Sequence, residues 1–202
     1  MKLKTTLLII IFQFSNSALF AQEFGIQLYS LRNQFNSDIE KSLKTISDWG
    51  INTIEGGDTY GMEESEFRSL LKKYELNPIS IGASYDELKD DPKGVVQKAL
   101  RYGARFVMCS WIPHKGNRFD IENTKAAVKI FNKAGAILKR EGITLAYHAH
   151  GYEFRPYEYG TLFVYIAQTA KNFSFDMDVC WMTHGGVDPR SRGVQEGGGV
   201  GV

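Results

Sequence analysis

Apolar residues recur along this chain with two periods that alternate. Short stretches in which every second residue is apolar are typical of β-strands, and longer stretches with apolar residues three or four positions apart are typical of helices. The predicted strands begin near six positions: Gly25, Ile51, Pro78, Arg105, Ile143 and Phe173. Because helical stretches separate them, the pattern predicts an α/β fold with a parallel sheet.

The predicted helices have recognisable ends. The first is expected to begin with a capping box of Ser37 and Glu40, and the third with Asp91 as its cap and a proline in its first turn. The longest is expected over residues 123–141, with Gly142 as its stop. Side chains expected in the core include Leu43, Ile46, Phe67, Leu71, Val95, Ala99, Leu100 and Phe131.

The number of strand–helix units limits the architecture. A (β/α) barrel of the TIM type takes ~250 residues and eight units, whereas this chain has 202 residues and supplies about six. We expect residues 22–189 to form such a barrel in incomplete form, inactive and poorly stable alone, with open edge strands. Residues 190–202 are rich in glycine and lack any period, which predicts a flexible tail.

The first 21 residues differ from the rest of the chain. Lys2 and Lys4 precede a short apolar run over residues 7–12, and small residues follow at Ala18 and Ala21. This pattern predicts a secretory signal peptide, since the apolar run is far shorter than the ~20 residues of a membrane span. We expect a secreted or periplasmic protein without membrane contact after cleavage.

Charge and cysteine content narrow the partners. The formal net charge is +1, without a Lys/Arg cluster, so neither a nucleic acid nor an anionic membrane is the expected partner. A small molecule is favoured instead, and a homo-oligomer is left open. Cys109 and Cys180 fall in the fourth and sixth predicted strands, roughly 9–10 Å apart, which exceeds the ~7 Å limit of a disulfide. Both are expected to be free and buried.

The most informative stretch is ITLAYHAHGYEF, residues 143–154. In a strand, His148 and His150 share one face, and Glu153 follows in the loop at the carboxyl end, where barrel enzymes place their active sites. Two imidazoles and a carboxylate are thus expected at one rim. The alternative is that both histidines are hydrogen-bonded lumen residues and that Glu153 is a solvated loop acid.

Further polar and aromatic residues fall near other strand ends. On the sixth predicted strand, Asp176 and Asp178 share the lumen face, which is costly unless a cation or a proton lies between them. Asp176 is more simply explained as a lumen acid satisfied by neighbouring strands than as a ligand. Glu55 is expected to bind a substrate hydroxyl or to support the residues that contact the substrate, and not to bind metal. Trp181 could pack on the apolar face of a sugar ring. The loop residues His114 and His184 are expected to be solvated.

Four motifs carry a resemblance to a known family: GIQLYSLR (25–32), TIEGG (53–57), YHAHGYEF (147–154) and DMDVCW (176–181), the last followed by GGVDP. Together they resemble the xylose-isomerase-like TIM-barrel family, also called the sugar phosphate isomerase/epimerase or AP endonuclease family 2 group. The resemblance implies a divalent metal (Mn, Zn, Mg or Co) held by Glu153 and Asp178. The family's other two ligands, from its seventh and eighth strands, have no counterpart here. His148 and His150 match a substrate-side motif, whereas Ser84 stands where relatives often have a histidine.

The expected function follows from this resemblance and from the chemistry of the residues. A metal beside a sugar carbonyl would make the adjacent C–H acidic enough for a carboxylate base such as Glu153. We expect a metal-dependent isomerase or epimerase of a non-phosphorylated sugar or keto-sugar. The alternatives are a keto-sugar lyase or hydratase on the same fold, or a carbohydrate-binding barrel without activity. The expected substrate contacts are His148, His150, Trp181 and Glu55.

Overall fold

Six parallel strands form the centre of the molecule. The computed structural model describes residues 24–116 and 118–190, and its strands run in the order β1-β2-β3-β4-β5-β8 with every neighbouring pair parallel. Their bounds are β1 Gly25–Gln27, β2 Thr53–Gly56, β3 Asn77–Gly82, β4 Phe106–Cys109, β5 Thr144–His148 and β8 Phe173–Asp176. The predicted α/β fold is confirmed, and each strand forms at its expected place.

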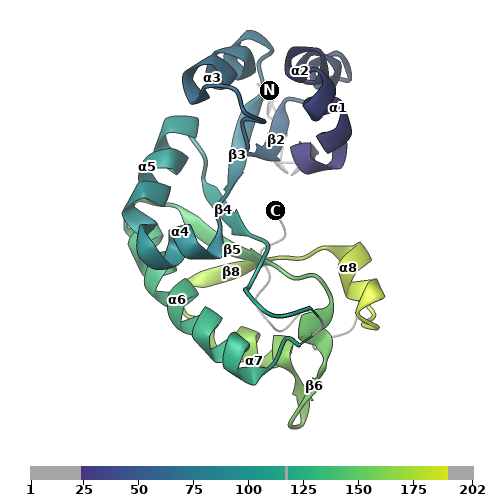
Figure 1. Cartoon of the computed structure of the whole chain (residues 1–202), viewed down its shortest axis with the longest axis vertical. Coiled ribbons are helices and arrows are strands. Elements are labelled where there is room, and N and C mark those ends of the chain that lie inside the picture. Colours follow the sequence, from purple (N-terminus) through teal and green to yellow (C-terminus); the bar gives the residue numbers. More distant parts are fainter. Residues whose placement is uncertain (1–23, 117, 191–202) are drawn as a thin grey trace, which may run out of the picture.

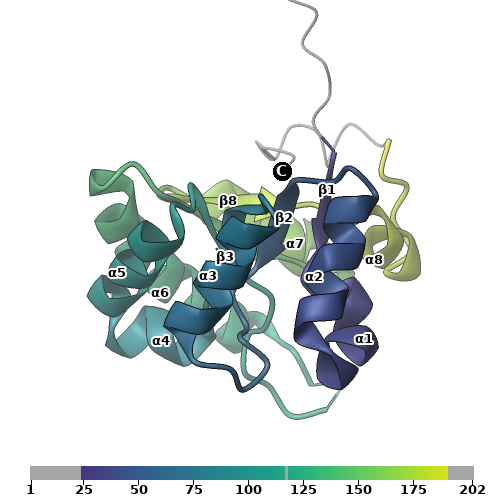
Figure 2. The same cartoon turned by 90° about the horizontal axis from the view of Figure 1, so that it is seen from above.

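Helices follow the strands and cover the outer side of the curved sheet (Figure 1). They are η1 Leu28–Leu31, α1 Arg32–Ser37, α2 Ile39–Asp48, α3 Glu64–Lys73, α4 Tyr85–Asp90, α5 Pro92–Tyr102, α6 Ile121–Arg140, η2 Tyr152–Phe154, α7 Leu162–Thr169 and α8 Val179–His184. A small antiparallel pair, β6 (Pro156–Tyr157) and β7 (Gly160–Thr161), lies between η2 and α7. In Figure 2, α4, α5 and α6 lie toward one end of the molecule and α1 and α2 toward the opposite end.

The sheet is open in the part of the chain that the structure describes. β1 and β8 are its two edges, and the sheet bends through the intervening strands without closing (Figure 1). A barrel missing part of its circumference was expected, and this expectation is confirmed. The cavity inside the bend is consequently bordered by two edge strands.

Alternate residues of each strand face either the helices or this cavity. Val107, Leu145 and Phe173 are register neighbours and are buried on the helix side against residues such as Phe131. Burying a side chain of this size stabilises the fold by about 1.5–3 kcal/mol. The other face carries His148 beside Asp176, so the apolar side holds the sheet together and leaves the polar side free for a site.

Some local expectations need correction. Helix α2 is capped by Asp38, which accepts a hydrogen bond from the Lys41 amide at 2.9 Å, and not by Ser37. The cap of α5 by Asp91 is confirmed. Leu100, expected in the core, is exposed, because the apolar stripe of α5 is narrower than the sequence indicates. Helix α4 was not predicted; Ser84 begins it through a capping box with Glu87.

The cysteines and the chain ends complete the description. Both thiols are free, as expected; Cys109 is buried, but Cys180 is exposed because it lies in the first turn of α8 and not in a strand. The predicted signal peptide (residues 1–21) and the predicted tail beyond Arg190 lie outside the described residues. None of the described helices is long and apolar enough to cross a membrane.

Candidate active site

Four strands bring polar side chains to one cavity. Register pairs Gln27 at the end of β1 with Glu55 on β2, and His148 at the end of β5 with Asp176 at the end of β8. Because carboxyl ends of parallel strands share one edge, these side chains meet there. Together with Asp178 they line a cavity of about 900 Å³, which lies within the size range of small-molecule sites.

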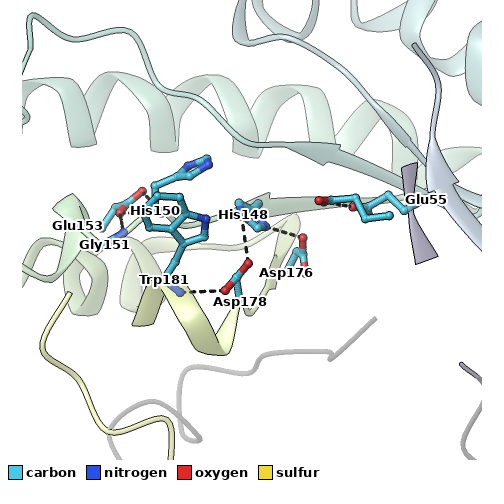
Figure 3. A network of polar contacts seen from close by, with 9 residues as sticks. Glu55, His148, His150, Gly151, Glu153, Asp176, Asp178 and Trp181 are labelled. Atoms are coloured by element: carbon cyan, nitrogen blue, oxygen red, sulfur yellow. Dashed lines mark hydrogen bonds and ion pairs between the residues drawn. The ribbon is translucent and has the colours of Figure 1, made fainter. Parts of the chain in front are cut away.

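His148 is the central residue of this cavity. Its imidazole is buried, and its Nδ1 forms a hydrogen bond of 2.8 Å with Asp176 Oδ2, while its Nε2 lies 4.0 Å from Asp178 Oδ2 (Figure 3). Burial acts to lower the pKa of His148. The hydrogen bond and the negative charges of Asp176, Asp178 and Glu55 outweigh this effect and leave the pKa raised. The geometry thus favours a charged imidazole whose Nε2 is open to the cavity.

Asp178 reaches the cavity from a helix end. Strand β8 ends at Asp176, two residues earlier than expected, and Asp178 becomes the N-cap of α8, where it accepts a 2.8 Å hydrogen bond from the Trp181 amide. Its side chain is 30% exposed. One oxygen is therefore engaged by the cap, and the other faces His148 without forming a hydrogen bond.

Asp176 and Glu55 are held by neighbouring strands. Asp176 was expected to be satisfied within the lumen, and its hydrogen bond with His148 confirms this. Glu55 accepts a 2.7 Å hydrogen bond from Gln27 Nε2 at the opposite side of the cavity. That bond occupies one carboxylate oxygen and fixes the orientation of the other.

His150 and Trp181 form a wall beside His148. The His150 ring lies 4.7 Å from that of His148 and 5.1 Å from that of Trp181, both in edge-to-face geometry. Burial and the nearby His148 lower the pKa of His150, which favours its neutral form. The ring contacts the Ser110 backbone, but its buried Nδ1 has no hydrogen bond of normal geometry within the described residues, and such a group calls for an explanation. A ligand hydroxyl would satisfy it.

Glu153 does not join the cavity. It is 0% exposed, and its carboxylate accepts hydrogen bonds from the Tyr147 hydroxyl, from the His150 amide at 3.1 Å and from the Gly151 amide at 2.9 Å. Tyr147 alternates with His148 and therefore points to the helix side of β5, against Phe131. The chain turns at Gly151 (φ 102°) and brings Glu153 back to that side. Figure 3 shows its carboxylate set apart from that of Asp178.

The expected metal centre is therefore not assembled by this pair. The oxygens of Glu153 are taken by three donors, which leaves it unsuited to share a cation with Asp178. Across residues 24–116 and 118–190, no group of three or more His, Cys, Asp or Glu side chains is arranged to hold a metal ion. The residues do not fit the metal that the resemblance implies, so the chemistry below uses only side chains.

An aromatic cluster lies beside the site, and its members Trp111 and Tyr152 were expected near strand ends from the sequence. Trp111 and His114, in the connection after β4, pack with Tyr152 of η2 at ring distances of 4.3 to 5.9 Å. His114 was expected to be solvated, but its Nδ1 contacts the Ile112 carbonyl at 2.6 Å and its ring lies within this cluster. The aromatic spacing in WIPH was visible in the sequence, but the approach of Tyr152 from another loop was not.

Comparisons with known proteins identify the fold. No protein-family model and no curated protein matches the sequence. Among solved structures, a sugar phosphate isomerase/epimerase from Parabacteroides distasonis superposes with a TM-score of 0.69 at 20% identity, covering 86% of this chain and 73% of that protein. A xylose isomerase-like TIM barrel protein from Mycobacterium smegmatis in complex with magnesium gives 0.56 at 14% identity, covering 79% and 65%.

A third similar structure is a probable 3-DHS dehydratase from Bacillus anthracis, with a TM-score of 0.59 at 15% identity and coverage of 83% and 67%. This chain thus spans about two thirds to three quarters of the length of these proteins. Its fold is that of the xylose isomerase-like TIM barrels, as the sequence motifs led us to expect. Since proteins of this fold differ in activity, function has to be argued from the site.

Proposed function

We propose that this chain binds a non-phosphorylated sugar or keto-sugar and transfers a proton next to its carbonyl, as an isomerase or epimerase. The observation that carries the proposal is the pair His148 and Asp178. An imidazole nitrogen and a carboxylate oxygen lie 4.0 Å apart side by side on the lining of one cavity, so one substrate can contact both. A general acid and a general base at hydrogen-bonding reach of one ligand are what this chemistry needs.

In the proposed reaction, Asp178 acts as the base and His148 as the acid. The Asp178 carboxylate removes the proton from the carbon next to the carbonyl, and His148 donates its Nε2 proton to the carbonyl oxygen, which gives an enediol. Return of the proton from Asp178 to the neighbouring carbon, while the hydroxyl on the first carbon gives its proton to the now neutral His148, yields the isomer. The epimer forms when a solvent proton reaches the first carbon from the other face, the hydroxyl made from the carbonyl returns its proton to His148, and Asp178 releases its proton to solvent. Asp176 holds the imidazole through Nδ1, so that Nε2 stays directed at the substrate.

The proposed substrate class rests on the cavity lining and on two residues beside it, His150 and Trp181. Trp181 is 37% exposed and can pack on the apolar face of a sugar ring. The second carboxylate oxygen of Glu55, which has no hydrogen bond within the described residues, suits a hydroxyl group, and so does the His150 imidazole. Three carboxylates and a single arginine, Arg105, line the cavity, which disfavours a phosphorylated sugar.

Two alternatives use the same cavity. With a leaving group on the carbon beyond the abstracted proton, the same acid–base pair would eliminate it, with His148 protonating the departing oxygen. That reaction would make the protein a keto-sugar lyase or hydratase, and the similar fold of a probable dehydratase favours keeping this candidate. A barrel that binds carbohydrate without proton transfer is the remaining candidate.

The test is solvent exchange followed by NMR. The full chain is incubated in D₂O with a panel of aldoses, ketoses and 3-keto-glucose, and deuterium at the carbon next to the carbonyl is measured. We expect incorporation with the wild type and with His184→Asn, an exposed histidine that does not line the cavity, and about a 10²–10⁴-fold loss with His148→Asn. Sugar binding without incorporation would instead identify a binding module.

Metal dependence and export are two further predictions, separate from the proposed reaction. Added Mn²⁺, Zn²⁺, Mg²⁺ or Co²⁺ forms a further arm of the exchange assay, since dependence on a metal held by Glu153 lacks geometric support. Export through residues 1–21 would place the protein where non-phosphorylated sugars occur. Cleavage of that segment after Ala21 can be checked by N-terminal sequencing of the exported chain.

A further inference from the structure

A second hollow lies beside the candidate active site, and the proposed chemistry does not use it. It has a volume of about 700 Å³ and is formed at the carboxyl ends of β3 and β4, below the connections that follow β2 and β4. Its lining includes Gly82, Ser84, Asp86, Lys98, Ser110 and Trp111. We call it the Trp111 hollow.

The Trp111 hollow and the active site share a wall. Ser110 and Trp111 line the hollow, and the Ser110 backbone lies beside His150 on the active-site side. A continuous row of rings follows the wall, with Trp111 5.9 Å from Tyr152, Tyr152 6.2 Å from His150, and His150 5.1 Å from Trp181. The Trp111 hollow therefore lies next to the aromatic residues that flank His148.

Trp111 is presented to the hollow as a fixed aromatic surface. Its ring stacks on His114 at 4.3 Å and 29° and meets Tyr152 edge-on at 79°. The contact of His114 with the Ile112 carbonyl holds the stack in place. Even so, Trp111 is 50% exposed. A large ring that is held rigidly and left half open suits the C–H face of a sugar, because the entropy cost of ordering it is already met.

The polar lining favours a neutral ligand with hydroxyl groups. Asp58, Glu64 and Asp86 outnumber the one cation, Lys98, which donates to the Gly82 carbonyl at 3.2 Å. This balance disfavours a phosphate or carboxylate ligand. Tyr102 also lines the hollow, and its buried hydroxyl has no hydrogen-bond partner within the described residues. An unpaired buried hydroxyl next to an open polar hollow points to a ligand that supplies the missing bond.

We infer that the Trp111 hollow binds a second, neutral sugar ring, so that the substrate is a glycoside of at least two rings. The reacting ring lies at His148 and Asp178, and the attached ring packs on Trp111. The identity of the reacting ring rests on the proposed function, whereas binding of the second ring does not.

Calorimetric binding tests this inference without any turnover. The probes are cellobiose, maltose and trehalose, each compared with the corresponding methyl glucoside, and glucose 6-phosphate as an anionic probe. We expect at least one disaccharide to bind about tenfold more tightly than its methyl glucoside, a ratio that one aromatic packing contact can supply. Trp111→Ala should bring that ratio close to one, and Trp111→Phe should restore part of it.

Trp49→Ala is the matched control. Trp49 is 56% exposed and follows α2, before β2 begins, so it belongs to the opposite rim; its removal should leave the ratio unchanged. Equal affinity for one and two rings, an unchanged ratio in Trp111→Ala, or preference for glucose 6-phosphate would overturn the inference. Disaccharide preference without deuterium exchange would refute the proposed function alone, and exchange without disaccharide preference would refute the second subsite alone.

Discussion

Glu153 and Asp178 were both expected to bind the metal ion, but the structure places them in opposite surroundings. Both follow strands that end at the same rim. Glu153 is fully buried and saturated by the Tyr147 hydroxyl and two backbone amides, and burial raises its pKa even though these hydrogen bonds oppose the change. Asp178 is partly open, has one backbone donor and faces His148. One carboxylate stabilises a turn, and the other is available to a ligand.

The difference shows that position after a strand does not decide the role of an acid. The turn through Gly151 directs Glu153 toward the helix side of β5, whereas the start of α8 leaves Asp178 at the cavity. A carboxylate whose oxygens already accept hydrogen bonds from buried donors is a poor base or ligand. It could react only if those hydrogen bonds broke, and that would leave the buried donors unpaired. The comparison can be tested by changing each acid separately.

The largest expected effect is on proton transfer in Asp178→Asn. The exchange rate should fall about 10²–10⁴-fold, since an amide cannot act as the base. Asparagine caps helices as well as aspartate does, so the free energy of unfolding should change by less than about 0.5 kcal/mol. Deuterium incorporation and urea unfolding on the same samples measure both. Exchange at the wild-type rate would show that Asp178 is not the base.

Glu153→Gln should give the reverse result. Glutamine offers one acceptor oxygen where the carboxylate offers two; with that oxygen on the amides of His150 and Gly151, its NH₂ group meets the Tyr147 hydroxyl, which loses its acceptor. The free energy of unfolding should fall by about 1–3 kcal/mol. The folded fraction should still exchange deuterium. Loss of exchange without loss of stability would restore Glu153 to the catalytic role expected from the sequence.

The sequence was sufficient for the sheet because the sheet depends on local periodicity. β5 is recognisable since Leu145 and Tyr147 alternate with polar or small residues, and the capping pair Asp91 and Pro92 marks the start of α5 without tertiary information. Leu100 was misplaced because its exposure depends on how α5 lies against its neighbours. Helix α4 was overlooked because its capping box is followed by a polar sequence without an apolar stripe.

The sequence predicted which residues gather at the site, but not which of them form hydrogen bonds with one another. His148, His150, Glu55, Trp181 and Asp178 do gather at one rim, since parallel strands bring their carboxyl ends together. The spacing of residues along the sequence could not predict which hydrogen-bond partner each polar atom would have. A buried tyrosine hydroxyl requires an acceptor, and Tyr147 on the helix side was the one sign in the sequence that Glu153 would be drawn there.

Removing the Tyr147 hydroxyl should have a smaller effect than changing Glu153. Tyr147→Phe takes away one of three donors to the carboxylate and leaves the two backbone amides, so the free energy of unfolding should fall by about 0.5–1.5 kcal/mol. The double variant with Glu153→Gln should lose less than the sum of the single changes, because both act on one contact. Additive losses measured by urea unfolding would mean that the two side chains do not interact.

The smallest expected effect is the pH dependence that Glu153 contributes to stability. Its pKa is raised in the folded state above the ordinary value of 4.5, chiefly by burial, so the folded chain holds this proton more tightly than the unfolded chain. The resulting stabilisation is fully present below pH 4.5 and is lost as the pH rises through the folded-state pKa.

Glutamine at position 153 cannot titrate. The stability difference between wild type and Glu153→Gln, followed by urea unfolding from pH 4 to pH 8, should therefore shrink as the pH rises. A wild-type advantage that grows over this range would mean that Glu153 is folded preferentially as the anion, with donors that outweigh its burial.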